Sequence, residues 1–294
     1  MINHFSYFYS LFNTILFKVI PNQKIKEMFD IVIPVDKKDL DILEKQLYYV
    51  RLNVINYRRI YLITNADFDL FKNMPFTNDC ILIPEFIFPF TIKTIENIRG
   101  INDRNGWYLQ QLLKLYAGLV IPEILERYLI IDADTFFFKP ITFIENDKCL
   151  YNYEEVPILD CYYNCLLELD ISFQKNKLQI SGITHHMLFE TSIIKEIFNK
   201  IEQNNFNKPF YLVILDLINK IPNNFAGFSE YELYFNYIYN NHKNKIILRK
   251  LNFCNVQDLI NLTVMKDYDY VSLHKWYLDK PENHEKKKII YENL

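Results

Sequence analysis

Glycine is the residue that this sequence most clearly lacks. Only five glycines occur in 294 residues, where roughly 7% is usual; they are Gly100, Gly106, Gly118, Gly182 and Gly227. No two of them have the spacing of G-x-G-x-x-G or G-x-x-x-x-G-K, which excludes the phosphate loops of Rossmann and P-loop proteins. Any phosphate that the protein binds must therefore be neutralised by side chains, by a metal ion or by the end of a helix.

The cysteines offer no zinc site and no evident disulfide framework. The chain has five of them and no C-x-x-C pair. Cys161 and Cys165 are four residues apart, but no second pair completes a tetrahedral zinc site. We interpret all five as buried thiols of a reducing compartment and expect a cytoplasmic protein.

A long apolar run is also missing. Residues 5–20 are rich in aromatic side chains, but polar residues such as Lys18 interrupt them. The stretch falls short of the roughly 20 apolar residues that span a bilayer, and no cleavage site marks a signal peptide. We predict that residues 1–25 form a helix that packs on the domain or lies at a membrane surface, with a marginal anchor as the alternative.

Neither sign of charge dominates the chain. The 33 Lys and Arg against 36 Asp and Glu give a net charge of −3, which excludes broad, non-specific binding of nucleic acid. Half of the residues are hydrophobic and 16% are aromatic, which suits a sizeable core and argues against disorder. At roughly 150 residues per domain, the length allows one large or two small domains.

Short apolar segments alternate with amphipathic ones in the first half of the chain. Strands are predicted at Asp30–Val35, Arg59–Thr64, Cys80–Pro84 and Tyr128–Ile131, and helices at Asp39–Val50 and Trp107–Val120. Apolar strands separated by helices predict an α/β fold whose parallel sheet is covered on both faces.

The second half is less regular. It predicts helices at Leu159–Leu169, Thr191–Gln203, Phe210–Ile218 and Ser229–Tyr239, and strands at His186–Phe189, Ile246–Arg249 and Tyr270–His274. Ser229 and Glu232 have the spacing of a capping box at the start of one helix. No proline- or glycine-rich linker divides the halves, so we predict one continuous domain.

The best candidate for chemistry is Asp132-Ala133-Asp134, which follows the apolar strand directly. Side chains two apart in extended chain point the same way, so both carboxylates are expected to face one spot. A parallel strand delivers that spot to the carboxyl edge of the sheet, where open α/β folds bind ligands. Two carboxylates there indicate Mg²⁺ or Mn²⁺ bridging to substrate phosphates; a turn-capping pair is the alternative.

Three other D-x-D pairs lack this context. Asp39/Asp41 opens a helix, Asp67/Asp69 has the position of a helix cap, and Asp267/Asp269 lies in a polar connection. The spacing alone is therefore weakly specific, and the position at the end of the apolar strand carries the prediction.

A polar stripe lies on the helix that precedes this strand. Trp107, Gln110 and Lys114 are spaced three and four apart and share one face, with Arg104 just before the helix. Cationic and polar side chains beside a metal site suit a phosphate or a carboxylate. The alternative is that Trp107 belongs to the core and that Lys114 is solvated.

Further candidates come from three later segments. Adjacent histidines in a strand point to opposite faces, so at most one of His185 and His186 enters a given pocket. If Glu232 caps the helix, Glu230 is available to project into a site. His274 comes at the end of a strand in which apolar residues alternate. Each of these residues alone is more often structural than functional.

Together these segments resemble the nucleotide-sugar glycosyltransferases of the GT-A type, and most of all the DUF6492 group of glycosyltransferase-like proteins. The segments that carry the resemblance are DIVIPVDKKD at 30–39, RNGWYLQQLLKL at 104–115, YLIIDADTFFFKP at 128–140, GITHHM at 182–187, FSEYELY at 228–234 and SLHKW at 272–276. The resemblance implies a GT-A-like, Rossmann-like fold over residues 26–280, with a donor half at about 26–150, an irregular acceptor half at about 151–280 and a polar tail at 281–294.

The resemblance also implies an activity: metal-dependent transfer of a sugar from a nucleoside-diphosphate donor, with UDP as the default, to a hydroxyl group of a glycan or another acceptor. It assigns Asp132, Asp134 and His274 to Mn²⁺ or Mg²⁺, Val35, Asp36, Arg104, Gln110, Lys114 and Ala133 to the donor, and Thr184, His185 and Trp276 to the acceptor side. Glu230 is the implied general base for an inverting reaction, with His186 as the second choice.

Three other functions remain open at this point. A haloacid-dehalogenase phosphohydrolase also has an apolar strand followed by D-x-D-x-[TV], but the last position here is Phe136. A sugar nucleotidyltransferase shares the sheet but needs a glycine-rich loop that the sequence lacks. A non-catalytic carbohydrate-binding derivative is the third alternative.

Overall fold

The computed structural model describes residues 28–155, 160–170, 176–222, 227–259 and 262–294. Its centre is a five-stranded sheet with the order β3-β2-β1-β4-β8. The strands are β1 (Phe29–Pro34), β2 (Tyr57–Thr64), β3 (Cys80–Pro84), β4 (Arg127–Ile131) and β8 (His186–Glu190). The first four are parallel, and β8 pairs antiparallel with β4. The predicted α/β class with a mostly parallel central sheet is confirmed.

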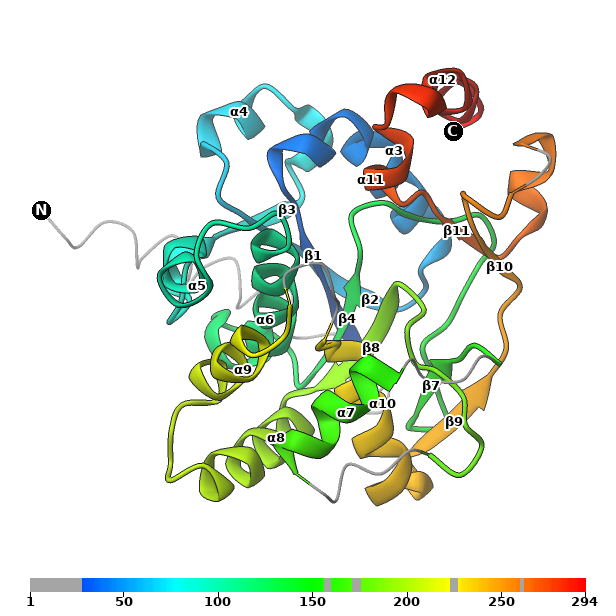
Figure 1. Cartoon of the computed structure of the whole chain (residues 1–294). Helices are drawn as coiled ribbons and strands as arrows, with labels where there is room; N and C mark the ends of the chain where they lie inside the picture. Colours follow the sequence, from blue (N-terminus) through cyan, green and yellow to red (C-terminus); the bar gives the residue numbers. More distant parts are fainter. Residues whose placement is uncertain (1–27, 156–159, 171–175, 223–226, 260–261) are drawn as a thin grey trace, which may run out of the picture.

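Helices connect the parallel strands and flank the sheet (Figure 1). The chain passes through α3 (Leu40–Asn53) between β1 and β2, α4 (Phe68–Lys72) between β2 and β3, and α5 (Ile92–Arg99) and α6 (Asn105–Val120) before β4. The later helices are α7 (Asp160–Leu169), α8 (Thr191–Asn204), α9 (Phe210–Asn219) and α10 (Glu230–Asn241). In Figure 1, α5, α6, α8 and α9 lie on one side of the sheet and α3 lies on the other.

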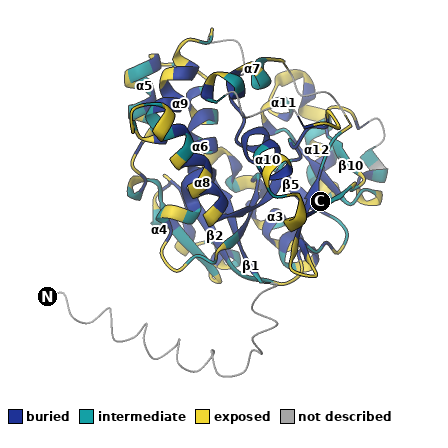
Figure 2. Ribbon diagram, turned by 90° about the horizontal axis from the view of Figure 1, so that it is seen from below, coloured by how far each residue is buried: buried dark blue, intermediate teal, exposed yellow. Residues whose placement is uncertain are grey.

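The sheet is buried along its whole centre (Figure 2). Every residue of β1 is buried, including the charged Asp30. The Asp30 carboxylate accepts hydrogen bonds from the Arg58 guanidinium, at 2.6 Å from Nη2, and from the backbone N–H of Leu125 at 2.8 Å. A buried carboxylate is tolerated in such a strand because its oxygens have these partners.

The strand order reverses between β1 and β4. From β1 the chain moves outward to β2 and β3, and β4 then pairs with the opposite edge of β1. In open α/β sheets, ligands bind outside the carboxyl ends of the strands at such a reversal. Asp132 directly follows β4 and Asp36 follows β1 by two residues, so both lie near this point.

Two smaller sheets join strands from the middle of the chain to strands of its second half. One has the order β10-β11-β5, formed by β10 (Phe253–Asn255), β11 (Tyr270–Ser272) and β5 (Thr135–Phe137). The other has the order β6-β7-β9, formed by β6 (Ile144–Glu145), β7 (Lys148–Asn152) and β9 (Ile246–Arg249). Because β11 is antiparallel to β5, with Ser272 opposite Thr135, the residues after Ser272 come to lie beside those before Thr135.

The C-terminal residues pack on the domain. The stretch 281–294, which we predicted to be a polar tail, forms a 3₁₀ turn (Pro281–Asn283) and α12 (His284–Asn293) after the short α11 (Lys275–Leu278). Ile290 of α12 is fully buried, and the Tyr49 hydroxyl of α3 donates to the carbonyl of Leu294 at 3.0 Å. These residues therefore belong to the folded domain.

The predicted capping box at Ser229 is wrong in its second half. The Ser229 hydroxyl accepts from the backbone N–H of Glu232 at 3.4 Å, as a cap does. The Glu232 carboxylate, however, accepts from the Ser181 hydroxyl at 2.5 Å and from the Asn236 amide at 2.9 Å. Glu232 is fully buried, and its carboxylate takes these core partners instead of the N–H of Ser229.

The remaining predictions concern the thiols and the membrane. All five cysteines are free, and Cys149 and Cys165 are buried while the other three are partly buried. In the ranges that the structure describes, no helix is long and apolar enough to cross a membrane. The helix predicted for residues 1–25 lies outside the described residues.

Candidate functional site

The site begins where β4 ends. The backbone N–H of Asp132 donates to the carbonyl of His185 at 3.0 Å, and the carbonyl of Asp132 accepts from Thr135 N–H at 3.0 Å. The chain thus makes a tight turn through Asp132-Ala133-Asp134 before β5 begins. The extended conformation that we predicted for these residues is therefore wrong. Ala133 is buried in the turn, and the two carboxylates have different partners, His185 for Asp132 and the backbone of Lys275 for Asp134.

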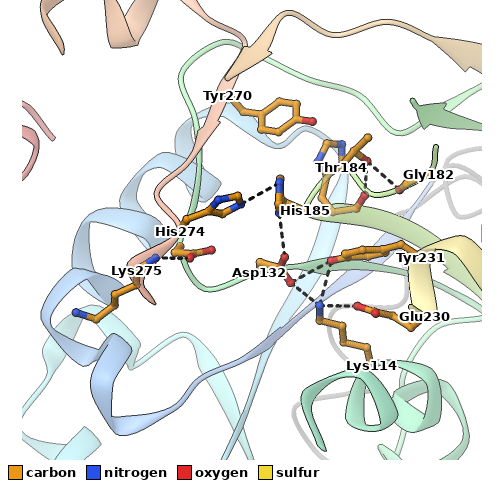
Figure 3. Close-up of polar contacts among 12 residues, drawn as sticks. Lys114, Asp132, Gly182, Thr184, His185, Glu230, Tyr231, Tyr270, His274 and Lys275 are labelled. Atoms are coloured by element: carbon orange, nitrogen blue, oxygen red, sulfur yellow. Dashed lines mark hydrogen bonds and ion pairs between the residues drawn. The ribbon is translucent and has the colours of Figure 1, made fainter. Parts of the chain in front are cut away.

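Asp132 is held by three side chains from distant parts of the chain (Figure 3). Its Oδ1 lies 2.5 Å from the Nζ of Lys114 and accepts from the Tyr231 hydroxyl at 3.1 Å. Its Oδ2 lies 3.4 Å from the Nδ1 of His185. Burial opposes ionisation, but the charge of Lys114 and the contact with His185 outweigh it, so the pKa of Asp132 falls below its ordinary value.

Lys114 joins Asp132 to Glu230. The Lys114 Nζ lies 2.7 Å from Glu230 Oε1, and the exposed fractions of the two side chains are only 3% and 4%. Burial alone would lower the pKa of Lys114, but the two carboxylates raise it, so the ammonium stays charged. Burial raises the pKa of Glu230 even though Lys114 opposes the shift. The predicted donor ligand Lys114 is therefore part of a buried ion cluster.

Asp134 faces the corner between β11 and α11. Its Oδ2 accepts from the backbone N–H of Lys275 at 3.1 Å, and its carbonyl accepts from Leu273 N–H at 2.9 Å. These two bonds flank His274, so the structure places the third predicted metal ligand beside the acidic pair.

His274 and His185 face one another across this corner. Their Nε2 atoms are 3.4 Å apart, and the Nδ1 of His274 lies 2.8 Å from the Gln257 amide oxygen. Burial and the neighbouring His185 lower the pKa of His274. The pKa of His185 is raised, because the hydrogen bond and charge of Asp132 outweigh the effect of burial.

His186 lies apart from this group. Its ring packs edge-on against Phe137, Phe143 and Tyr270, with centroids 5.2, 5.4 and 4.7 Å away. Both ring nitrogens are buried without a hydrogen-bond partner in the described part of the chain. Burial lowers the pKa of His186 to about 3, so the ring is neutral. This apolar setting favours a packing role over that of a base, while Thr184 binds the backbone of the same segment through its hydroxyl.

The other predicted donor residues are spread along two elements. Val35 is buried, and the Asp36 carboxylate caps the 3₁₀ turn Lys37–Asp39 that follows β1. The Arg104 guanidinium lies 5.7 Å from the centroid of Trp107, ten residues and about 15 Å along α6 from Lys114. The predicted polar residues therefore do lie on one helix, but the two cations, Arg104 and Lys114, lie in different surroundings. Gln110 is half-buried between them.

Sequence reasoning missed two residues of this region. Tyr231, which donates to Asp132, stands next to Glu230 in the FSEYELY segment, and this adjacency was the available signal. Asp39 opens α3, as the sequence predicts, but it is also buried, and burial together with the charge of Asp134 raises its pKa to about 6.

The donor set fits a cation that also binds phosphate. Among the residues that the structure describes, no three His, Cys, Asp or Glu side chains form a complete metal-binding group, and Lys114 already neutralises Asp132. Mg²⁺ sites nonetheless take only one or two carboxylates and complete their coordination with substrate phosphates and water. Asp134 and His274 supply a carboxylate and an imidazole of that kind.

Comparisons with known proteins identify a family and find similar solved structures. The family described as "Family of unknown function (DUF6492)" matches residues 14–293. No curated protein matches the chain. Mouse xyloside xylosyltransferase 1 in its apo form is similar in structure, with 11% identity, a TM-score of 0.42 and coverage of 90% of this chain and 93% of that one. The apo structure of the bifunctional glycosyltransferase WbbM has 11% identity, a TM-score of 0.45 and coverage of 92% and 53%.

Proposed function

The chain belongs to the DUF6492 family, whose function is unknown, and on this premise we propose that it is a metal-dependent glycosyltransferase. It would move a sugar from a nucleoside-diphosphate donor, with UDP as the default, to a hydroxyl group of a glycan or another acceptor. The observation that carries the proposal is the acidic pair Asp132/Asp134, which leaves β4 where the strand order reverses and meets His274 from the far end of the chain.

The charge of a diphosphate explains why a cation belongs here. The chain has no glycine-rich loop that could bind phosphates with backbone N–H groups. The ammonium of Lys114 is buried between two carboxylates, so its charge is already balanced. When bound, Mn²⁺ or Mg²⁺ would stabilise the negative charge that develops on the departing diphosphate.

The residues at the end of β4 would have separate tasks. Asp134 and His274 would hold the cation. Lys114 and Tyr231 fix the Asp132 carboxylate in one orientation, so the site needs little reorganisation when the donor binds. Val35, Asp36 and Ala133, at the ends of β1 and β4, would lie along the nucleoside and ribose of the donor.

The acceptor would approach from the side of α11. Trp276 is 62% exposed, and its ring stacks on His274 at 5.9 Å and 27°. An exposed aromatic face beside the cation suits the apolar face of a sugar ring. Glu230 would take the proton of the acceptor hydroxyl if the reaction inverts the anomeric centre. Its carboxylate is 4% exposed and paired with Lys114, so the acceptor would have to displace that ion pair.

Thermal shifts test donor and cation together. We expect a rise in Tm with one nucleoside diphosphate, UDP first among UDP, ADP, GDP and CDP, only when Mn²⁺ or Mg²⁺ is present. Asp134→Asn should remove this rise and lower sugar transfer by on the order of 10²-fold or more. Asp69→Asn is the matched control, because Asp69 belongs to an exposed D-x-D at a helix cap. Full transfer in excess EDTA would refute the proposal.

A further inference from the structure

Two imidazole rings face each other at the edge of the proposed cation site. The Nε2 atoms of His185 and His274 are 3.4 Å apart, and the rings lie at 69° with centroids 4.8 Å apart. The two residues come from distant segments, one just before β8 and the other between β11 and α11. Their approach is therefore a product of the fold and not of local sequence.

The partners of the other ring nitrogens determine where the protons lie. The Nδ1 of His185 faces the Asp132 carboxylate, and the Nδ1 of His274 faces the amide oxygen of Gln257. Both oxygens can only accept, so in the neutral rings each Nδ1 carries the hydrogen. The 3.4 Å between the two Nε2 atoms is hydrogen-bond distance, so without a cation one proton lies between the rings; when both rings are neutral, each Nε2 presents a lone pair to the same space.

The backbone also holds both rings in this arrangement. His185 has φ of 63° and His274 has φ of 45°, in the left-handed region that residues other than glycine seldom adopt. Such conformations persist where the surroundings over-determine them, and they concentrate at ligand sites. Here the backbone of His185 is fixed by Asp132, and that of His274 is flanked by both bonds to Asp134.

We propose that His185 joins His274 and Asp134 as a ligand of the cation; this inference rests on the proposed function. In the described part of the chain these side chains do not form a complete metal-binding group by themselves, so substrate phosphate and water would complete the coordination. A cation would take the place of the proton that the two Nε2 atoms share. Ligating histidines commonly donate their other N–H to a carboxylate or an amide oxygen, as both do here. Asp132 therefore acts on the cation through His185, and Asp134 binds it directly.

The proposal predicts the kind of cation. Imidazole nitrogen suits first-row transition ions, whereas Mg²⁺ prefers oxygen ligands. Two imidazoles therefore favour Mn²⁺ over Mg²⁺ more strongly than a site with one imidazole does. The side chain of His185 is 13% exposed, so a cation could reach it from solvent.

Nitrogen couplings in the spin-echo spectrum of bound Mn²⁺ test the assignment. The full chain is titrated with Mn²⁺ in the presence of UDP, and the number of coupled imidazole nitrogens is measured together with the affinity. The variants are His185→Asn and His274→Asn, since asparagine tolerates a positive φ. His242→Asn is the control, because His242 also pairs with a carboxylate, that of Glu196, but lies elsewhere on the surface.

We expect two coupled nitrogens in the wild type and in His242→Asn, and one in each of the other two variants. The Kd for Mn²⁺ should rise by on the order of 10-fold or more in His185→Asn, and the preference for Mn²⁺ over Mg²⁺ should fall. One nitrogen in the wild type that persists in His185→Asn overturns the role of His185 and leaves the proposed function intact. No Mn²⁺ binding by the wild type overturns both proposals.

Discussion

Lys114 determines the charge of the site more than either of its acidic partners. Within the described ranges it is the cation that contacts both Asp132 and Glu230, and all three groups are largely removed from water. A buried charge is tolerated only when it is paired, because its desolvation costs several kcal/mol. Lys114 therefore allows two carboxylates to stay ionised within one small region.

Lys114→Met is expected to lower the free energy of unfolding by about 3–5 kcal/mol, because it leaves two buried carboxylates without a cation. Urea denaturation at neutral pH measures the loss. Glu230→Gln alone should lower the free energy of unfolding by less, because the charges of Lys114 and Asp132 still neutralise each other. The double variant Lys114→Met/Glu230→Gln should recover part of the loss, and a double variant no more stable than Lys114→Met would contradict the idea that Glu230 and Lys114 are coupled.

Glu85 gives a pH-dependent prediction away from the ion cluster. It follows β3 at the carboxyl edge of the sheet, and burial, with the charge of Asp36, raises its pKa from 4.5 to about 7. Between these values the folded chain keeps a proton that the unfolded chain has lost. The free energy of unfolding therefore falls as the pH rises from about 4.5 to 7.

Glu85→Gln should remove that loss. The side chain is only partly buried, so we expect the variant to be about 1 kcal/mol more stable than the wild type at pH 8, after allowance for solvent screening. At pH 4, where Glu85 is protonated in both states, the two proteins should be equally stable. A constant difference across the range would exclude the titration of Glu85 as its cause.

Single residues of the site were predictable only when they lay in one local pattern. Asp132 and Asp134 could be found because they follow an apolar strand, and Lys114 because it lies on the polar face of the preceding helix. The contact between Lys114 and Glu230 joins residues 116 positions apart, and nothing in either segment encodes it. The left-handed φ of His185 was equally invisible, since we expected a regular strand there.

At the scale of helices and strands, the elements with the longest apolar pattern were predicted best. β3 has the predicted bounds, and α6 and β4 begin within two residues of the predicted start, because each buries a continuous set of apolar side chains. β5 and β10 have three residues each, too few to show a period. Their pairing with β11 depends on where the rest of the chain places them.

The close packing of α6 on β4 and α8 makes one glycine irreplaceable. A Cβ at Gly118 would lie 2.4 Å from the Thr191 hydroxyl and 2.5 Å from a ring carbon of Tyr128, both of which are buried. Gly106, near the start of the same helix, has nothing within 4 Å of its Cβ position. The two glycines form a matched pair on one element.

Gly118→Ala is expected to lower the free energy of unfolding by about 1–3 kcal/mol, because overpacking outweighs the higher helix propensity of alanine. Gly106→Ala should instead raise it by about 0.5 kcal/mol. Thermal and urea unfolding of both variants measure the difference. Equal effects at the two positions would show that helix propensity, and not contact with β4, determines how these substitutions change the stability.

At the scale of the whole molecule, the buried apolar side chains of the described residues form two clusters. The larger one surrounds the central sheet, and the smaller one lies between α3, the β5–β11 pair and α12. The smaller cluster includes Phe136 and Leu273, which flank Asp134 and His274 in the chain. The cation site therefore lies at the boundary of the two clusters, with Asp132 anchored in the first and His274 attached to the second.

This division predicts that the two clusters open separately. Ile290 of α12 is fully buried in the smaller cluster and Ile201 of α8 in the larger one, so replacing either by alanine should cost about 2–5 kcal/mol locally. Hydrogen exchange should accelerate in β5 and β11 of Ile290→Ala while β1 stays protected, because part of the structure can open below the free energy of global unfolding. Ile201→Ala should instead accelerate exchange in the central sheet. Equal acceleration of β1 and β11 in Ile290→Ala would show that the domain opens as one unit, and His274 could then not be loosened without melting the strand that carries Asp132.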